Sequence, residues 1–145
     1  MDVSTDGLAK TIKNAKDIKI VLQEIKSFIT SPTLQEHLEK LLLQKGMKRQ
    51  DVIKNTELDS GYAYQLFNGI RKNPSRNQAL SLAFGFGLNN EETDRLLKIA
   101  GVGALYSKNK RDAVIIYSLE NGKSLAQTNE ILSSLNLETL AEHKK

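Results

Sequence analysis

The chain has 145 residues and carries 21 Lys and Arg side chains against 17 Asp and Glu, for a formal net charge of +4. It contains no cysteine, which excludes disulfide bonds, cysteine-ligated metal centres and thiol nucleophiles. No apolar run approaches the roughly 18 residues that a membrane-spanning helix needs, and residues 1–6 lack the basic start of a signal peptide. We therefore expect a cytoplasmic protein without a membrane partner.

The sequence offers no residue pattern typical of catalysis or metal binding. His37 and His143 are far apart, and acidic residues occur mostly singly or in helix-start pairs such as Glu91-Glu92. A catalytic site needs groups such as a paired acid and base, or a nucleophile with its base. We therefore expect that the protein is not an enzyme and needs no metal or other cofactor.

The first 31 residues are predicted to form an amphipathic helical extension. Six apolar residues fall on one face at helical spacing, and basic and amide residues point the other way. The apolar residues are Ile18, Val21, Leu22, Ile25, Phe28 and Ile29. We expect this face to cover the protein's own core, a second subunit or another protein partner; membrane binding is the less favoured alternative.

Signals that begin and end helices follow along the rest of the chain, and strand patterns are nearly absent. Three capping boxes are predicted, at Thr33–Glu36, Ser75–Gln78 and Ser124–Gln127. Glycines stand where helices should end, at Gly46, Gly69, Gly85 or Gly87, Gly101 and Gly122. The predicted helices cover residues 33–45, 48–55, 75–86, 91–100, 109–121 and 124–135, with one more between Asp59 and Gly69. The sequence therefore predicts an all-α fold.

The net positive charge is concentrated in one part of the chain. Residues 45–76 contain seven Lys and Arg and three Asp and Glu, which amounts to the whole net charge of +4. Such a concentration is typical of proteins with a polyanionic partner. A solvated basic face is an equally good interpretation of the charge alone.

The same part of the chain contains a helix-turn-helix pattern between Lys48 and Gly69. A short helix, a tight connection at residues 56–58 and a second helix that begins after Asp59 follow one another. The apolar residues that would hold the two helices together are Val52, Leu58, Ala63 and Leu66. This arrangement is typical of motifs whose second helix enters the major groove of DNA.

With its flanking helices, this pattern resembles the Cro/phage-repressor (XRE-type) DNA-binding domain. The resemblance covers Thr33–Gly101, and residues 66–70, Leu-Phe-Asn-Gly-Ile, resemble the end of a recognition helix in lambda-type repressors. It implies a five-helix lambda-repressor-like domain over residues 32–101, between the extension at 1–31 and a helical pair at 102–145. This last segment is expected to pack on the core or on a dimer mate.

The resemblance also implies roles for individual residues. Contacts with base edges are expected from the exposed face of the second helix, at Ser60, Gly61, Tyr64 and Gln65. Phosphate contacts are expected from Lys48, Arg49, Asn68, Arg71, Lys72 and Arg76. Tyr62 is expected to close the core instead, and for the basic residues simple solvation stays an alternative.

Two residues depart from the pattern of this family. Ile53 stands where a small residue is usual, and Glu57 stands where glycine is usual. A residue other than glycine in a left-handed turn conformation costs on the order of 1 kcal/mol, so we expect strain at Glu57.

The function that the resemblance implies is a sequence-specific double-stranded DNA-binding transcriptional regulator, acting as a dimeric repressor in a bacterium or its mobile elements. Homodimerisation is expected because a single short helix reads too few base pairs. The alternative is a protein-interaction adaptor or antitoxin-like module that uses the same scaffold, with the N-terminal helix binding a protein partner.

Overall fold

A computed structural model describes Ile18 and residues 32–141, and all structural statements concern these residues. In this part of the chain the structure has seven helices and no strand, which confirms the all-α prediction. The helices are α3 (Leu34–Lys45), α4 (Arg49–Lys54), α5 (Ser60–Phe67), α6 (Arg76–Phe86), α7 (Asn90–Ile99), α8 (Lys110–Glu120) and α9 (Leu125–Ser134). The predicted N-terminal helix falls outside the described residues except for Ile18.

The contacts divide the chain into two compact units, Met1–Pro32 and Thr33–Lys145. All seven helices belong to the second unit. The segment from residue 102 onward therefore shares a compact unit with the predicted DNA-binding domain.

The helix ends follow the predicted capping residues closely. In each of the three predicted capping boxes the hydroxyl of Thr33, Ser75 or Ser124 accepts a hydrogen bond from the backbone three residues on. Among the residues that the structure describes, the glycines with positive φ are Gly46, Gly69, Gly87, Gly101 and Gly122. Of the two candidates for the end of α6, Gly87 is therefore correct, because it takes the left-handed conformation that favours glycine.

Gly85 lies inside α6 and has a different role. A Cβ atom at this position would lie only 2.8 Å from the carbonyl oxygen of Val52 and 2.7 Å from Cγ2 of Thr56. Glycine thus lets the backbones of α4 and α6 approach more closely than any side chain would allow.

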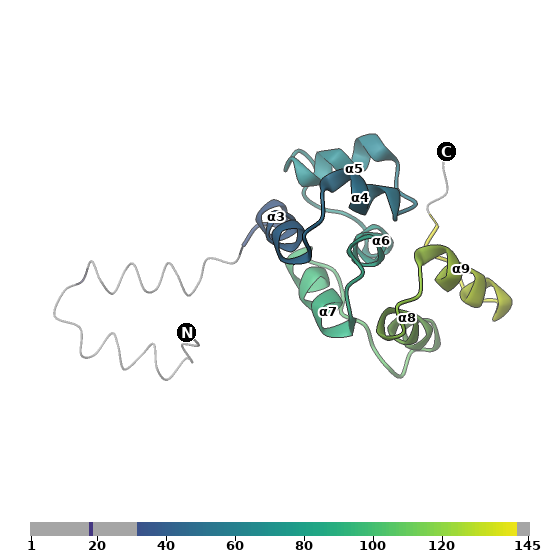
Figure 1. The fold of residues 1–145 in the computed structure, drawn as a ribbon. Coiled ribbons are helices and arrows are strands. Elements are labelled where there is room, and N and C mark those ends of the chain that lie inside the picture. Colours follow the sequence, from purple (N-terminus) through teal and green to yellow (C-terminus); the bar gives the residue numbers. More distant parts are fainter. Residues whose placement is uncertain (1–17, 19–31, 142–145) are drawn as a thin grey trace. The chain divides into compact units, whose positions relative to one another are not determined.

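Helix α6 lies at the centre of the second unit (Figure 1). Every residue from Ala79 to Phe86 is buried, and α6 packs against α3, α4, α7 and α9. A helix with apolar side chains on all sides is stable only when its neighbours cover it all round. The helix-turn-helix and the C-terminal pair therefore share one hydrophobic core.

The C-terminal pair completes this core. Ile115 and Leu119 of α8 and Leu132 of α9 belong to the same buried cluster as the residues of α6. Beyond α9 the side chain of Leu140 is fully buried, and its backbone N–H donates to Oδ1 of Asn129 at 2.8 Å. Helices α8 and α9 thus pack on α7 and α6 respectively, and part of the apolar surface of residues 102–140 is buried there.

Helix α3 carries a buried histidine. His37 is 4% exposed, and its Nε2 has no hydrogen-bond partner among the described residues. Burial lowers the pKa of His37, and the nearby positive charges of Lys40 and Arg95 lower it further. The folded state therefore favours the neutral imidazole, whereas in the unfolded chain the imidazole binds a proton as the pH falls through about 6.5.

We expect the free energy of unfolding to decrease as the pH falls below about 6.5, the ordinary pKa of histidine. The sign follows because the unfolded state binds more protons than the folded state between the lowered pKa and 6.5. Urea unfolding at pH 7.5, 6.5 and 5.5 measures the effect. The His37→Leu variant keeps a side chain of similar volume and should lose this part of the pH dependence. If the free energy of unfolding of the variant changed with pH as steeply as that of the unmodified protein, His37 would not be its cause.

Candidate nucleic-acid interface

The candidate interface is built on the pair of helices α4 and α5. Helix α5 begins after Asp59, whose carboxylate accepts a hydrogen bond from the backbone N–H of Tyr62 at 3.0 Å. One side of α5, formed by Ala63, Leu66 and Phe67, is buried against the neighbouring helices. The opposite side is left free of the core and faces outward.

The connection between the two helices is held by a threonine. The hydroxyl of Thr56 donates to the carbonyl oxygen of Ile53 at 2.8 Å and accepts from the backbone N–H of Leu58 at 3.3 Å. Among the described residues Asn136 is the only non-glycine residue with positive φ, so Glu57 is not in the left-handed region. The expected strain at Glu57 is therefore wrong, because a side-chain hydrogen bond shapes a turn that does not need that conformation.

The four residues predicted to contact bases lie on the outward side of α5 or at its edge. Ser60 and Gly61 are exposed at the start of the helix, and the ring of Tyr64 is 39% exposed one turn later. Gln65 is half-buried, and its Oε1 accepts a hydrogen bond from Nε of Arg71 at 3.1 Å. A polar surface free of charged residues thus follows the length of α5.

Tyr62 lies on the inner side of the same helix. Its ring packs against the core, and its hydroxyl donates to Oε1 of Gln78 in α6 at 2.8 Å. This contact ties α5 to the central helix α6.

Arg49 occupies a position between three helices. Its guanidinium donates to Oδ1 of Asn68 at 2.6 Å, forms an ion pair with Glu39 of α3, and lies 5.8 Å from the ring centre of Phe67. Cation–π and carboxylate contacts of this kind fix the position of an arginine. Arg49 and Asn68, both predicted to contact phosphate, therefore link the first and second helices of the motif to each other and to α3.

Three cations around α5 have exposed side chains. Lys48 precedes α4, and Arg71 and Lys72 follow α5. None of the three forms an ion pair with another residue in the described part of the chain. These are the predicted phosphate contacts whose charge remains available.

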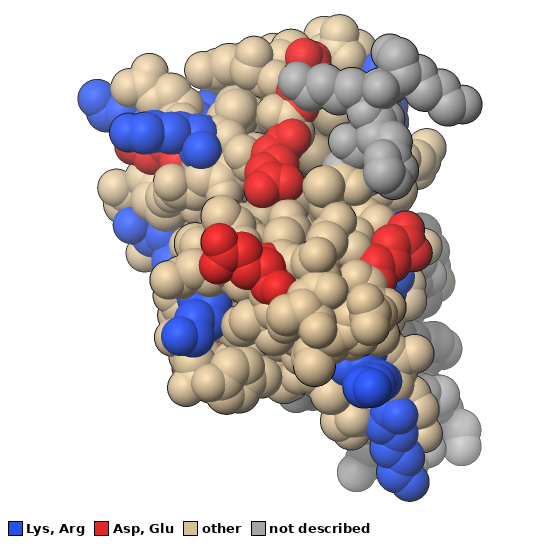
Figure 2. All heavy atoms as spheres, turned by 90° about the vertical axis from the view of Figure 1, so that its right-hand side faces the viewer, with Lys and Arg blue, Asp and Glu red and all other residues tan. Residues whose placement is uncertain are grey.

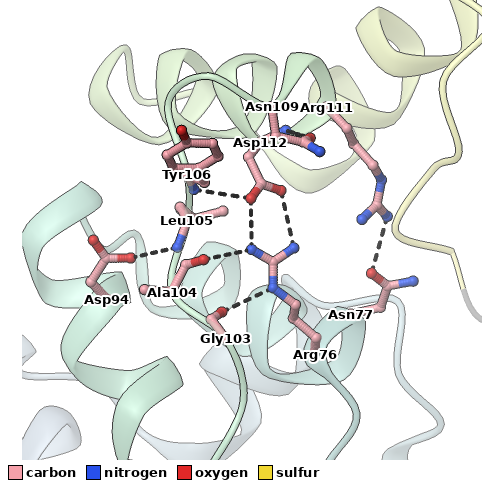
Figure 3. A network of polar contacts seen from close by, with 10 residues as sticks. All are labelled: Arg76, Asn77, Asp94, Gly103, Ala104, Leu105, Tyr106, Asn109, Arg111 and Asp112. Atoms are coloured by element: carbon pink, nitrogen blue, oxygen red, sulfur yellow. Dashed lines mark hydrogen bonds and ion pairs between the residues drawn. The ribbon is translucent and has the colours of Figure 1, made fainter.

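Arg76 has a different set of partners. Its Nη1 and Nη2 donate to the two carboxylate oxygens of Asp112 at 3.0 and 2.8 Å, and its Nε and Nη2 donate to the carbonyl oxygens of Gly103 and Ala104 at 2.9 Å each (Figure 3). The carboxylate of Asp112 also accepts from the backbone N–H of Tyr106 at 3.0 Å. Four of the five guanidinium N–H groups thus donate inside the protein and Asp112 pairs with the charge, so Arg76 does not belong to the candidate interface.

The same network joins the loop after α7 to the flanking helices. Asp94 accepts from the backbone N–H of Leu105 at 3.0 Å, and Arg111 donates to Oδ1 of Asn77 in α6 at 3.0 Å (Figure 3). Although burial raises the pKa of Asp112, hydrogen bonds from Arg76 and Tyr106 and the charges of Arg76 and Arg111 hold that pKa below its ordinary value. Asp112 is therefore an ionised, buried anchor for Arg76.

The pairing of charges reduces the positive charge that the sequence concentrates in residues 45–76. Arg49, Lys45 and Arg76 pair with Glu39, Glu92 and Asp112, and all three acids come from outside that segment. On the side of the molecule that carries α8 and α9, basic and acidic groups are both present, separated by neutral surface (Figure 2). Within residues 45–76, the cations that form no ion pair with a described residue are Lys48, Lys54, Arg71 and Lys72.

A groove beside the end of α5 includes residues that the sequence analysis did not single out. It has a volume of about 340 Å³ and is lined by Thr33 and Gln35 of the α3 start together with Gly69, Arg71 and Lys72. The amide of Gln35 lies where a Cβ of Gly69 would be. In the sequence, only Gly69 itself indicates that another group approaches the backbone here, and it does not identify Gln35 as that group.

No group of three or more His, Cys, Asp or Glu side chains suited to a metal ion is present in the described residues. Within the same residues no helix is long and apolar enough to span a membrane.

We expect Arg76→Met to lower the free energy of unfolding by about 3 kcal/mol, since the buried carboxylate of Asp112 then lacks its partner. The matched variant Lys72→Met, at an exposed cation without an ion pair, should change it by less than about 0.5 kcal/mol. Urea unfolding followed by circular dichroism measures both. Equal stability of the two variants would contradict the internal role of Arg76.

Comparison with protein-family models, curated proteins and solved structures gives no match to this chain.

Proposed function

We propose that the protein is a sequence-specific double-stranded DNA-binding transcriptional regulator that acts as a dimeric repressor, with α5 as its recognition helix. The observation that carries this proposal is the outer surface of α5, where Ser60, Gly61, Tyr64 and Gln65 form an exposed or half-exposed polar strip. Exposed cations stand at both ends of the α4–α5 pair. Short helices with this combination of polar surface and flanking cations suit the major groove.

The order of the helices supports the same proposal. Helices α3–α7 follow one another with the short pair α4 and α5 in second and third place, and α6 packs behind α4. This order is what the resemblance to the Cro/phage-repressor domain implies. We propose that α3–α7 form a lambda-repressor-like domain, to which α8 and α9 add a further layer.

In the proposed complex the residues divide into three groups by their contacts. Lys48, Arg71 and Lys72 neutralise phosphates, because their side chains are exposed and form no ion pair with a described residue. Ser60, Tyr64 and Gln65 face the base edges, where the amide of Gln65 has the donor and acceptor pattern that adenine requires. Arg49 and Asn68 hold α5 in position through their mutual hydrogen bond of 2.6 Å.

Dimerisation follows from the length of the recognition helix. The eight residues of α5 reach too few base pairs to select one site in a genome. Two copies related by a two-fold axis would read half-sites about one turn of DNA apart, roughly 34 Å. A dimer of this kind over a promoter represses by excluding the polymerase.

We expect binding to a DNA fragment from the protein's own promoter region to weaken steeply with salt. Three phosphates per protomer, and thus six per dimer, predict a slope of log K against log salt concentration near −5. Fluorescence anisotropy of the labelled fragment between about 50 and 200 mM KCl measures the slope. A flat response, or no binding at the lowest salt, would overturn the proposed mechanism.

The Gln65→Ala variant should relax base preference at one position of each half-site by roughly 1–3 kcal/mol. Selection of bound sequences from a random DNA library measures this preference. Gln50→Ala, at an exposed position of the neighbouring helix α4, is the matched control and should leave the base preference unchanged. An equal loss of affinity of Gln65→Ala for all sequences would mean that Gln65 contacts only the backbone.

A second function is favoured by one observation, the pairing of three basic residues of this region with acids from elsewhere in the chain. These ion pairs leave few unpaired cations around α5. The exposed Tyr64 and the 67% exposed Ile70 near the end of this helix suit a protein interface. In this alternative the molecule is an adaptor or antitoxin-like module. Deletion of residues 1–31 separates the two proposals, since only the adaptor requires that segment for partner binding.

A further inference from the structure

A second surface of the protein, apart from the candidate interface, contains a cleft of about 520 Å³. One wall is the connection between α4 and α5, at residues 54–57, and the other is the turn between α8 and α9 with the first residues of α9, at residues 122–127. Sites for small molecules usually occupy clefts of roughly 300–1,000 Å³. The cleft therefore has the size of a binding site for a small molecule.

The lining of the cleft includes apolar side chains from the core. Phe84 and Leu88 belong to α6 and the residues after it, Leu119 belongs to α8 and Leu125 to α9, and all four are buried. The cleft thus reaches down to the hydrophobic core, so a ring or a branched aliphatic group can be removed from water there.

The polar lining is positively charged on balance. Lys54 lies on one wall and Lys123 on the other, and neither forms an ion pair with a described residue. The one carboxylate of the lining, Glu57, already accepts a hydrogen bond from Nδ2 of Asn129 at 3.2 Å. Helix α9 starts at this cleft without an acidic residue in its first turn, which adds to the positive potential.

We propose that this cleft binds a small organic anion with an aromatic or branched aliphatic body. The body of the ligand packs against Phe84, Leu88 and Leu119, and its carboxylate pairs with Lys54 and Lys123. Such a ligand contacts the turn of the helix-turn-helix and the C-terminal pair at once. The site is separate from the proposed DNA surface, and its test uses no DNA.

Titration of the full-length, ¹⁵N-labelled chain with benzoate, followed by amide chemical shifts, tests this proposal. We expect saturable shifts at residues of both walls, including Thr56, Gly122 and Ala126, with no comparable shifts along α3. Benzamide, the neutral analogue, should bind about fivefold more weakly or worse, and benzylamine should give no saturable shifts. No saturable shift with benzoate, or equal binding of all three compounds, would overturn the proposal.

Variants of the lining make the test specific. Lys54→Gln and Lys123→Gln should each weaken benzoate binding about fivefold, the upper range for an exposed ion pair, whereas Lys108→Gln, outside the cleft, should leave it unchanged. Ala126→Phe replaces an exposed helical residue at the cleft and should abolish binding. The amide spectrum and unfolding curve of each variant report its folding, and unchanged benzoate affinity in a folded Ala126→Phe variant would overturn the proposal.

Discussion

The burial of α6 on all sides is the constraint on which the rest of the structure depends. From Ala79 to Phe86 no residue of this helix is left to solvent, so its neighbours must supply apolar surface from every direction. Helix α4 lies so close that only glycine fits at position 85. The place of α5 follows, because α5 packs against α4 and α3 and its Tyr62 bonds to Gln78 of α6.

Charge has two roles in this protein that a count of residues does not separate. Arg49 and Arg76 form ion pairs with Glu39 and Asp112, and these contacts hold helices and loops together. A buried or half-buried ion pair with several hydrogen bonds helps to select one packing arrangement of the helices and loops that it joins. It contributes less to affinity for an outside partner. The exposed cations that remain near α5 are few, and the proposed DNA binding depends on them.

The local features of the fold could be predicted from the sequence, because each depends on a few neighbouring residues. The capping box at Thr33 and the left-handed glycine at position 46 are examples, and both are found where they were predicted. The partners of Arg76 could not be predicted, since Asp112 lies 36 residues away and meets it only through tertiary packing. The unstrained turn at Glu57 was missed for another reason: the hydroxyl of Thr56 bonds to the backbone of Ile53 and Leu58, and Glu57 stays outside the left-handed region. The candidate cleft likewise joins segments more than sixty residues apart in the sequence.

The position of Leu140 has a consequence for the synthesis of the protein. This fully buried side chain lies beyond the last helix, and its backbone is held by Asn129 of α9. The ribosome covers the most recent stretch of a growing polypeptide, so the core stays open on this side until residue 140 has left the ribosome. The molecule therefore reaches its native packing late in its production, and during that interval the incomplete core is exposed to chaperones and proteases.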